Sequence, residues 1–387
     1  MAPFKLLIAP AIIVLLVIHP VKAQIIPTTS PDDYINTIQT AVPFLLIPTD
    51  ARSASLGNSG LATSPDAGSI YFNAAKLAFI PEKNPFGLSI SYLPWLSELI
   101  DGLYIADIST FIKLDDEQAL SLGTRYFSLG NLTITSATGN VISEFRPNEL
   151  TVDAAYARKL SPDFSAGLTL KYIYSNLTTL PGFTANDNQP VQDIAGDISL
   201  FYANTISEKS DLNVGLAIKN IGGKMWYTNI ITKDYLPTNL GIGLGYSYEI
   251  TPNHQISISG EVNKLLVPTP DTTDVDPANG IFDFREYSMM QGMLTSFSDA
   301  PQGFSEEIDE INYRAGLEYL MNKIFAARAG YYYEAPSKGG RQYFTFGAGI
   351  QYSSFALDLG YQSPIGNQNS HLNKTFSMTL QILIDKS

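Results

Sequence analysis

Apolar residues recur at every second position in segments of about ten residues, which follow one another from Phe86 to the end of the chain. In residues 164–175, one face carries Phe164, Ala166, Leu168, Leu170, Tyr172 and Tyr174, and the other carries Ser165, Gly167, Thr169, Lys171, Ile173 and Ser175. A period of two is typical of β-strands, and tilted strands of this length cross a bilayer. We count about fourteen such segments, which predicts an all-β fold, a transmembrane antiparallel β-barrel of about 14 strands.

The connections between these segments alternate in length. Short connections fall at residues 114–117, 161–162, 207–210, 251–253, 321–322 and 353. Most of the connections between them are long, at residues 128–148, 178–191, 221–234, 266–309, 334–340 and 363–373. Outer-membrane barrels combine short periplasmic turns with long outer loops in this way. A soluble β-sandwich gives no reason for connection lengths to alternate, so the pattern favours the barrel.

Charges are distributed unevenly between the two faces of the predicted strands. The polar face carries both signs, at Asp153, Lys171, Asp197, Lys219, Glu261, Arg314, Glu318, Arg328 and Asp358, whereas the opposite face is almost uncharged. Lipid requires an uncharged face, and mixed charges facing a narrow lumen can pair across it. A soluble sandwich also alternates apolar and polar positions, and the charges of both signs on the polar face count against it.

The chain divides into three predicted parts. Residues 1–23 have the charged start, apolar stretch and small-residue end of a secretory signal peptide, which predicts cleavage near Ala23. Residues 24–85 do not alternate and are rich in small residues, which suggests a periplasmic segment that plugs the lumen. Residues 86–387 form the predicted barrel, in which residues 266–309 make a long outer loop.

Composition and motif spacing exclude several classes of function. The 37 acidic residues exceed the 24 Lys and Arg residues, which disfavours nucleic-acid binding, and the absence of cysteine excludes thiolate chemistry. His254 and His371 fall in connections at opposite ends of the predicted barrel, so no histidine pair forms. The acidic cluster at Asp271, Asp274, Asp276, Asn279 and Asp283 lacks the spacing of a calcium loop. We therefore expect no enzyme activity, no metal site and no cofactor.

The long outer loop holds the strongest candidate for partner binding. Three of the seven methionines lie within five positions beside three aromatic residues, and the candidate binding residues are Phe282, Phe284, Tyr287, Met289, Met290 and Met293. Methionine adapts to varied partners, and an apolar patch on an outer loop is expected to be covered. Two alternatives stay open here: the segment binds a partner, or it folds inward and caps its own barrel.

Three features together resemble a known family. They are the stretch DARSASLGNSGLAT at residues 50–63, the Asn-Ala-Ala-Lys-Leu-Ala element at residues 73–78, and the layout of the strands. The chain resembles the FadL-like outer-membrane barrels and, within them, the PorV family of the type IX secretion system of Bacteroidota. One departure is that the superfamily usually has Asn-Pro-Ala where this chain has Asn73-Ala74-Ala75. This difference weakens any transfer of a FadL-type hatch mechanism.

The resemblance implies a non-enzymatic role in protein secretion at the cell outer membrane. Members of the family bind the C-terminal signal domains of cargo leaving the translocon barrel. They then deliver the cargo to the PorU sortase and attachment complex, which attaches it to lipopolysaccharide in the outer-membrane lipid. The alternative is a FadL-type transporter of hydrophobic small molecules, which would need an apolar lumen. Inward apolar residues such as Ile173, Phe201 and Leu383 are few.

Overall fold

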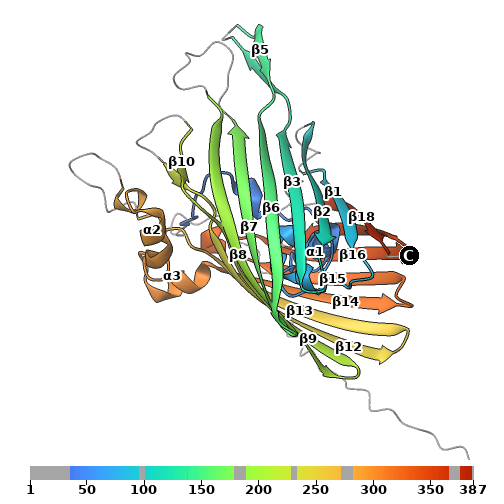
Figure 1. Ribbon diagram of the computed structural model, residues 1–387. Coiled ribbons are helices and arrows are strands. Elements are labelled where there is room, and N and C mark those ends of the chain that lie inside the picture. The colour runs from blue at the N-terminus through green and yellow to red at the C-terminus, as the bar shows by residue number, and fades with distance from the viewer. Residues whose placement is uncertain are drawn as a thin grey trace, which may run out of the picture.

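The computed structural model describes residues 35–95, 101–136, 138–177, 189–227, 233–271, 282–365 and 375–385. Fourteen strands form one closed barrel, in the order β1-β18-β17-β16-β15-β14-β13-β12-β9-β8-β7-β6-β3-β2 (Figure 1). The neighbouring strands are antiparallel, including β1 and β18, which close the barrel. The predicted fold class is therefore confirmed.

The barrel strands are β1 (Phe86–Leu93), β2 (Leu103–Lys113), β3 (Gln118–Leu129), β6 (Asn148–Ser161), β7 (Phe164–Asn176), β8 (Val191–Ser207), β9 (Ser210–Gly222), β12 (Asn239–Thr251), β13 (His254–Leu265), β14 (Ile311–Met321), β15 (Phe325–Tyr333), β16 (Gln342–Tyr352), β17 (Phe355–Pro364) and β18 (Thr375–Ile384). Two hairpins lie outside the barrel sheet, β4 (Leu132–Thr135) with β5 (Val141–Phe145), and β10 (Lys224–Met225) with β11 (Asp234–Tyr235). The helices are η1 (Pro43–Leu46), α1 (Ala51–Ser55), η2 (Ser69–Tyr71), η3 (Ala74–Phe79), η4 (Asp283–Arg285), α2 (Met289–Thr295), α3 (Phe304–Asp309) and η5 (Pro336–Lys338).

The alternation along each strand separates an outer apolar face from an inner polar one. In β7, Leu168 and Leu170 are 60% and 63% exposed on the outside, whereas Ser165 and Lys171 are buried in the lumen. Successive side chains of a strand point to opposite faces of the sheet. The pairing register of each strand therefore turns all its alternating apolar side chains toward lipid. The alternation in the sequence and the exposure in the structure therefore agree.

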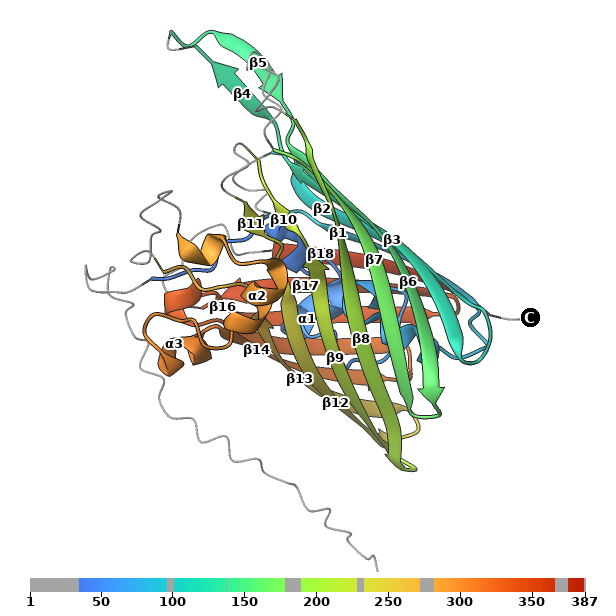
Figure 2. The ribbon, with the colours of Figure 1, turned by 60° about the vertical axis from the view of Figure 1, so that its left-hand side comes forward.

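The two ends of the barrel differ. At one end, which we call the short-turn end, hairpins such as that between β14 and β15 turn within a few residues, with Asn322 and Lys323 in left-handed conformations. Such conformations suit tight turns between twisted antiparallel strands. The other end, the long-loop end, carries the β4–β5 hairpin, the β10–β11 hairpin, α2 and α3 (Figure 2).

The residues before β1, which we call the plug (residues 35–84), run through the lumen. Near the long-loop end, the backbone N–H of Ala41 donates to the carbonyl oxygen of Tyr235. At the other end, the side chain of Asn84 donates to Asp385, just after the last strand. The plug thus enters the lumen among the long loops and leaves it at the short-turn end.

Among the described residues, no helix has the length and apolar character needed to cross a membrane.

Candidate functional site

The helix α1 and the residues after it, up to residue 61, lie in the lumen and are fixed to three strands of the barrel wall through backbone N–H groups. Asp50 caps the helix by accepting from the backbone N–H of Ser53. The backbone N–H of Ala51 donates to Thr379 Oγ1 in β18 (2.8 Å), and that of Gly57 donates to Thr345 Oγ1 in β16 (2.9 Å). The N–H groups of residues 60 and 61 both donate to one carboxylate oxygen of Glu261 in β13. Buried polar groups need hydrogen-bond partners, and here side chains of the wall supply them to the backbone of the plug.

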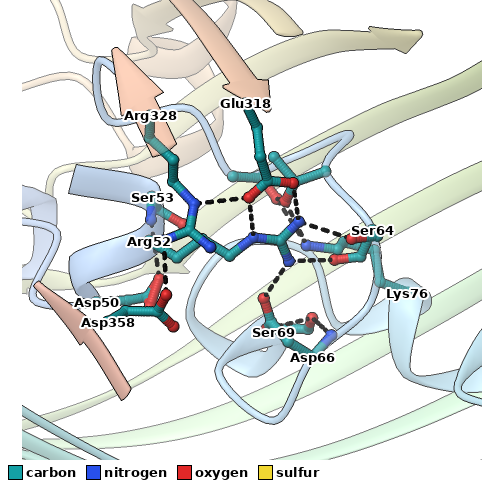
Figure 3. A network of polar contacts seen from close by, with 12 residues as sticks. Asp50, Arg52, Ser53, Ser64, Asp66, Ser69, Lys76, Glu318, Arg328 and Asp358 are labelled. Atoms are coloured by element: carbon teal, nitrogen blue, oxygen red, sulfur yellow. Dashed lines mark hydrogen bonds and ion pairs between the residues drawn. The ribbon is translucent and has the colours of Figure 1, made fainter. Parts of the chain in front are cut away.

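A charge network joins the plug to the strands β14, β15 and β17 (Figure 3). Arg52 of α1 contacts Glu318 (3.1 Å) and Asp66 (3.1 Å), and Arg328 contacts Glu318 (2.6 Å) and Asp358 (2.6 Å). All five side chains are at most 14% exposed. The guanidinium of Arg52 also donates to Ser64, so the network links two parts of the plug as well. Buried charges are tolerated only when they are paired, and here each has at least one partner.

Glycines allow the plug backbone to touch the wall. Gly57 has a φ of 66°, in the left-handed region, and a Cβ there would overlap the carbonyl oxygens of Tyr331 and Ala315. In β15, a Cβ at Gly330 would overlap the backbone nitrogen of Gly57. Glycine adopts this conformation without steric cost and permits this approach. The lumen is therefore filled by backbone packing as well as by side chains.

Two cavities lie along the lumen and share no lining residue. The larger, of about 730 Å³, is lined by Pro43, Asn58, Trp95, Arg341 and Tyr343, together with other residues near the long loops. The smaller, of about 330 Å³, is lined by Arg52, Ser64, Glu318 and Ile324, among other residues toward the short-turn end. Residues of the plug line both cavities and lie between them.

The long loop between β13 and β14 is tied to the mouth of the barrel by buried carboxylates of α3 and of Glu310, which follows it. Lys338 contacts Glu306 (2.6 Å) and Glu310 (3.0 Å), and Lys264 contacts Glu307 (3.0 Å) and Glu310. The side chain of Asn36 in the plug also donates to Glu306 (3.0 Å). These contacts join the plug, the loop and the strand ends at one place.

Asp299 lies beside this charge cluster, in the segment between α2 and α3. Burial, and then the negative charges of Glu307 and Glu310, raise the pKa of Asp299 to about 6. Thr269 is its hydrogen-bond partner, and the backbone N–H of Thr269 donates to one carboxylate oxygen (3.3 Å). The carboxyl of Asp299 therefore changes charge near pH 6.

The predicted binding segment, residues 282–293, is divided between the barrel and solvent. Phe282 and Phe284 stack on each other (5.7 Å between ring centroids). The hydroxyl of Tyr235 lies 2.8 Å from the carbonyl oxygens of Phe284 and Tyr287, which attaches the segment to the β10–β11 hairpin. Gly292 is buried against the rings of Tyr235 and Pro268. One face of this segment thus packs on its own barrel.

The opposite face of α2, together with α3, forms an exposed apolar surface. Its members, which we call the α2–α3 apolar patch, are Met290 (57% exposed), Leu294 (68%), Phe297 (52%), Phe304 (79%) and Ile308 (44%). Met290 and Leu294 are spaced i and i+4, which puts them on one side of α2, and Phe297 follows just after the end of that helix. Of the predicted residues, Met290 belongs to this patch, whereas Phe282, Phe284, Tyr287, Met289 and Met293 are half-buried.

Sequence reasoning missed several of these residues. Arg52 lies within the stretch that resembles the PorV family, but no periodicity marks it as a partner of Glu318. Lys264 and Lys338 lie 74 positions apart in the sequence. They come together because both form an ion pair with Glu310 of the intervening loop. The i, i+4 spacing of Met290 and Leu294 was the one signal that could have identified the exposed face.

The other chemical candidates form no site within the described residues. His254 contacts the hydroxyl of Tyr319 (2.7 Å), and His371 lies outside the described residues. Asp274, Asp276 and Asn279 of the acidic cluster also lie outside them. Over the described ranges, no group of His, Cys, Asp and Glu side chains is placed to hold a metal ion.

Comparison with known proteins gives one family and one fold. The model of the family described as "Type IX secretion system protein PorV" matches residues 30–272. No curated protein sequence matches the chain.

Solved structures resemble the chain in fold at low sequence identity. One is a TodX deltaS2S3 mutant, a monoaromatic hydrocarbon channel, with a TM-score of 0.51, 11% identity, and coverage of 87% of this chain and 98% of that chain. Others are the P. putida toluene transporter TodX (TM-score 0.49, 11% identity, 85% and 95% covered) and a Pseudomonas aeruginosa FadL homologue (TM-score 0.46, 10% identity, 90% and 99% covered). The similarity is that of FadL-like barrels and concerns the fold alone.

Proposed function

The chain belongs to the PorV family of type IX secretion system proteins, and from this premise we propose that it docks secreted cargo at the outer membrane. In this proposal, its outer loops bind the C-terminal signal domain of cargo that leaves the translocon barrel. The protein then delivers the cargo to the PorU sortase and attachment complex, which attaches it to lipopolysaccharide. The chain itself catalyses no reaction and needs no cofactor in this role.

The observation that carries the proposal is the filled lumen. Plug residues separate the two cavities, and buried pairs such as Arg52–Glu318 fix the plug to the wall. Breaking a buried ion pair leaves an uncompensated charge, which costs about 3–5 kcal/mol, so moving the plug is unfavourable. A barrel closed in this way suits docking at its outer loops better than diffusion through its lumen.

The docking surface in this proposal is the α2–α3 apolar patch, extended by the predicted residues beside it. Apolar side chains exposed together on an outer loop are typical of protein-binding surfaces. Met290 supplies the direct contact among the predicted residues, whereas the other five are half-buried: Phe282, Phe284, Tyr287, Met289 and Met293. The long-loop end is outermost, as in other outer-membrane barrels.

An outer-membrane location follows from the barrel fold and the family. Export to that membrane requires a signal peptide, and we propose that residues 1–23 serve as one and are removed near Ala23. Those residues lie outside the described part of the chain. Sequencing the N-terminus of the protein purified from outer membranes tests this point.

The direct test is site-specific crosslinking in native outer membranes. A photo-crosslinking amino acid replaces Leu294, the crosslinked protein is purified, and its partners are identified by mass spectrometry. The proposal predicts secreted proteins that still carry their C-terminal signal domains, together with the translocon barrel or the sortase. Recovery of the barrel alone, with co-purifying hydrocarbons or fatty acids, would contradict the proposal.

Matched variants show whether the patch itself is responsible. Leu294→Ser and Phe304→Ser remove exposed apolar side chains and are expected to lower cargo recovery about tenfold or more, as loss of binding hot spots does. Ile35→Ser is the control, because Ile35 is 59% exposed near the mouth of the barrel but lies outside the patch. An equal loss of cargo in all three variants would contradict a specific role for the patch.

The alternative function is FadL-type transport of hydrophobic small molecules. The larger cavity favours it, because one of its walls carries the apolar side chains of Leu46, Ile47, Leu93 and Trp95. Transport would also require the plug to open a path to the smaller cavity. Uptake of a radiolabelled monoaromatic hydrocarbon into cells, compared with cells lacking the protein, decides between the two.

A further inference from the structure

The β4–β5 hairpin projects beyond the long-loop end, away from the other outer elements (Figure 2). It is a separate two-stranded sheet, and among the described residues no other strand pairs with either of its edges. Leu132 in β4, and Val141 and Ile142 in β5, are 45%, 63% and 61% exposed. An isolated two-stranded hairpin is at best marginally stable in water, and a third strand stabilises it.

The two edges of the hairpin differ in chemistry. The β4 strand reads Leu-Thr-Ile-Thr, which is uncharged, free of proline and rich in β-branched residues. The β5 strand carries the charge of Glu144, and it holds the extra residue, Ile142, where the register shifts opposite Ile134 and Thr135. Charges, prolines and bulges are the devices that protect exposed strand edges, and β4 has none of them. Its free edge is therefore the one suited to pair with another strand.

We propose that β4 is a docking edge, to which the cargo's C-terminal signal domain adds an extended strand by backbone hydrogen bonding. This inference rests on the proposed function and adds the mode of recognition to it. The partner strand is uncharged at the positions that face Leu132 and Ile134, because a charge there would be desolvated against apolar side chains. Backbone pairing reads little sequence, so one edge accommodates many cargo proteins.

Two features favour cargo over other occupants. The β4 strand has four residues, so its edge offers few hydrogen bonds and the pairing is readily released, as transfer to a sortase requires. A second copy of this chain, inserted in the same membrane in the same direction, would present its own β4 in parallel. Parallel pairing is the weaker arrangement per residue.

The test measures backbone amide hydrogen exchange in the full-length protein, held in nanodiscs. The probe is the purified C-terminal signal domain of a protein secreted by the same bacterium. Addition of the domain is expected to slow exchange at residues 132–135 by about tenfold or more, because paired amides are protected. The α2–α3 apolar patch is followed in the same experiment, as a reporter of binding by the other surface.

Two variants separate backbone pairing from general loss of apolar surface. Thr133→Lys places a charge on the β4 edge opposite Glu144, its cross-strand neighbour, so the hairpin itself keeps an opposite-charge pair. It is expected to weaken binding of the domain about tenfold. Ile142→Lys adds the same charge to β5 and is expected to change the affinity less than about twofold.

Each other outcome overturns the inference in a recognisable way. Binding that protects the patch but leaves exchange at residues 132–135 unchanged would refute the docking edge and leave the proposed function standing. Absence of any binding by the signal domain would refute both. Protection of residues 132–135 that depends on the concentration of the barrel alone would identify a second copy as the occupant. If Thr133→Lys and Ile142→Lys weakened binding of the domain equally, the loss would be a nonspecific effect of the added charge, and pairing at the β4 edge would be refuted.

Discussion

Arg52 shows how single residues hold the plug in the lumen. Its guanidinium reaches Glu318 in the wall and Asp66 in the plug, and its side chain is 13% exposed. The attraction between such charges is strong because little water screens them, but each charge depends on its partner. The plug is therefore held by a network in which removal of one member leaves others buried and unpaired.

Removal of this guanidinium is expected to destabilise the folded barrel. Arg52→Ala leaves Glu318 with Arg328 alone and Asp66 without its ion-pair partner, a loss of about 3–5 kcal/mol. The control is Arg341→Ala, because the side chain of Arg341 is 57% exposed in its pair with Glu334 and is expected to contribute at most about 1 kcal/mol. Urea unfolding in detergent micelles, followed by tryptophan fluorescence, measures both. Similar losses in the two variants would contradict the network.

Backbone packing of the plug gives a second prediction at this scale. Gly57→Ala is expected to cost about 1–3 kcal/mol through its left-handed conformation, and more through overlap with Tyr331. Gly260→Ala is the control, because a Cβ at Gly260 meets no atom within 4 Å. The same unfolding measurement applies. If both variants were equally stable, the plug would not touch the wall as described.

The sequence predicted the charges of the lumen but not their partners. Glu318, Arg328 and Asp358 lie on the polar face of alternating strands, so their inward direction follows from periodicity alone. Their pairing with Arg52 does not, because that residue is more than 250 positions away in a segment without alternation. Contacts of this kind depend on how the plug packs, which local pattern does not determine.

The long-loop elements α2 and α3 illustrate the same limit at the scale of elements. The sequence identified an apolar cluster in the loop and left two alternatives open, binding a partner or capping the barrel. In the structure, Met289 and Met293 are half-buried while Met290 and Leu294 are exposed. The choice of face depends on the fit of Gly292 against Tyr235 and Pro268, which are remote in sequence.

The docking of α2 and α3 on the barrel is expected to depend on pH through Asp299. Its pKa is raised from 3.8 to about 6, so the docked form binds the proton more tightly than an undocked form does. Stability of docking is therefore greater at pH 5 than at pH 7 and falls as pH rises through about 6. Hydrogen exchange of the α2–α3 amides, corrected for intrinsic chemistry, is expected to be several-fold slower at pH 5.

Asp299→Asn isolates this carboxyl from the rest of the cluster. The variant keeps a side-chain oxygen for the backbone N–H of Thr269 but removes the charge that Glu307 and Glu310 repel. Glu306 does not titrate in this range, because burial, which raises its pKa, is outweighed by hydrogen bonds from Lys338, Gln302 and Asn36. Exchange in the variant is expected to be nearly independent of pH between 5 and 7. If the exchange rates of Asp299→Asn depended on pH as those of the native protein do, a group other than Asp299 would be responsible.

At the scale of the whole molecule, the barrel was predictable and the path of the plug was not. Alternation and the alternating connection lengths were enough for an antiparallel barrel of about 14 strands, because both follow from the bilayer. The small residues of the plug indicated close packing but not its direction. In the structure, residue 35 lies at the long-loop end, where the backbone N–H of Asn36 donates to Ser337.

Labelling of single cysteines tests this direction. The chain has no native cysteine, so Ile35→Cys and Lys323→Cys each carry one thiol. A membrane-impermeant maleimide is expected to label Ile35→Cys in intact cells, because Ile35 is exposed at the long-loop end. Lys323→Cys, in a turn at the opposite end, is expected to react only after the outer membrane is permeabilised. The reverse labelling pattern would show that the barrel is inserted in the opposite orientation and would contradict this account.

The central claim is that the protein works with its lumen closed, and a disulfide that locks the plug tests it most directly. A Cβ at Gly243 lies 3.3 Å from the Cβ of Ala62, close to the 3.5–4.5 Å of a disulfide. The double variant Ala62→Cys/Gly243→Cys is expressed in cells lacking the native protein, with each single variant as a control. Secretion of cargo is then measured with and without reductant. We expect the locked protein to restore secretion as fully as the reduced one; loss of secretion on locking, reversed by reductant, would contradict the account.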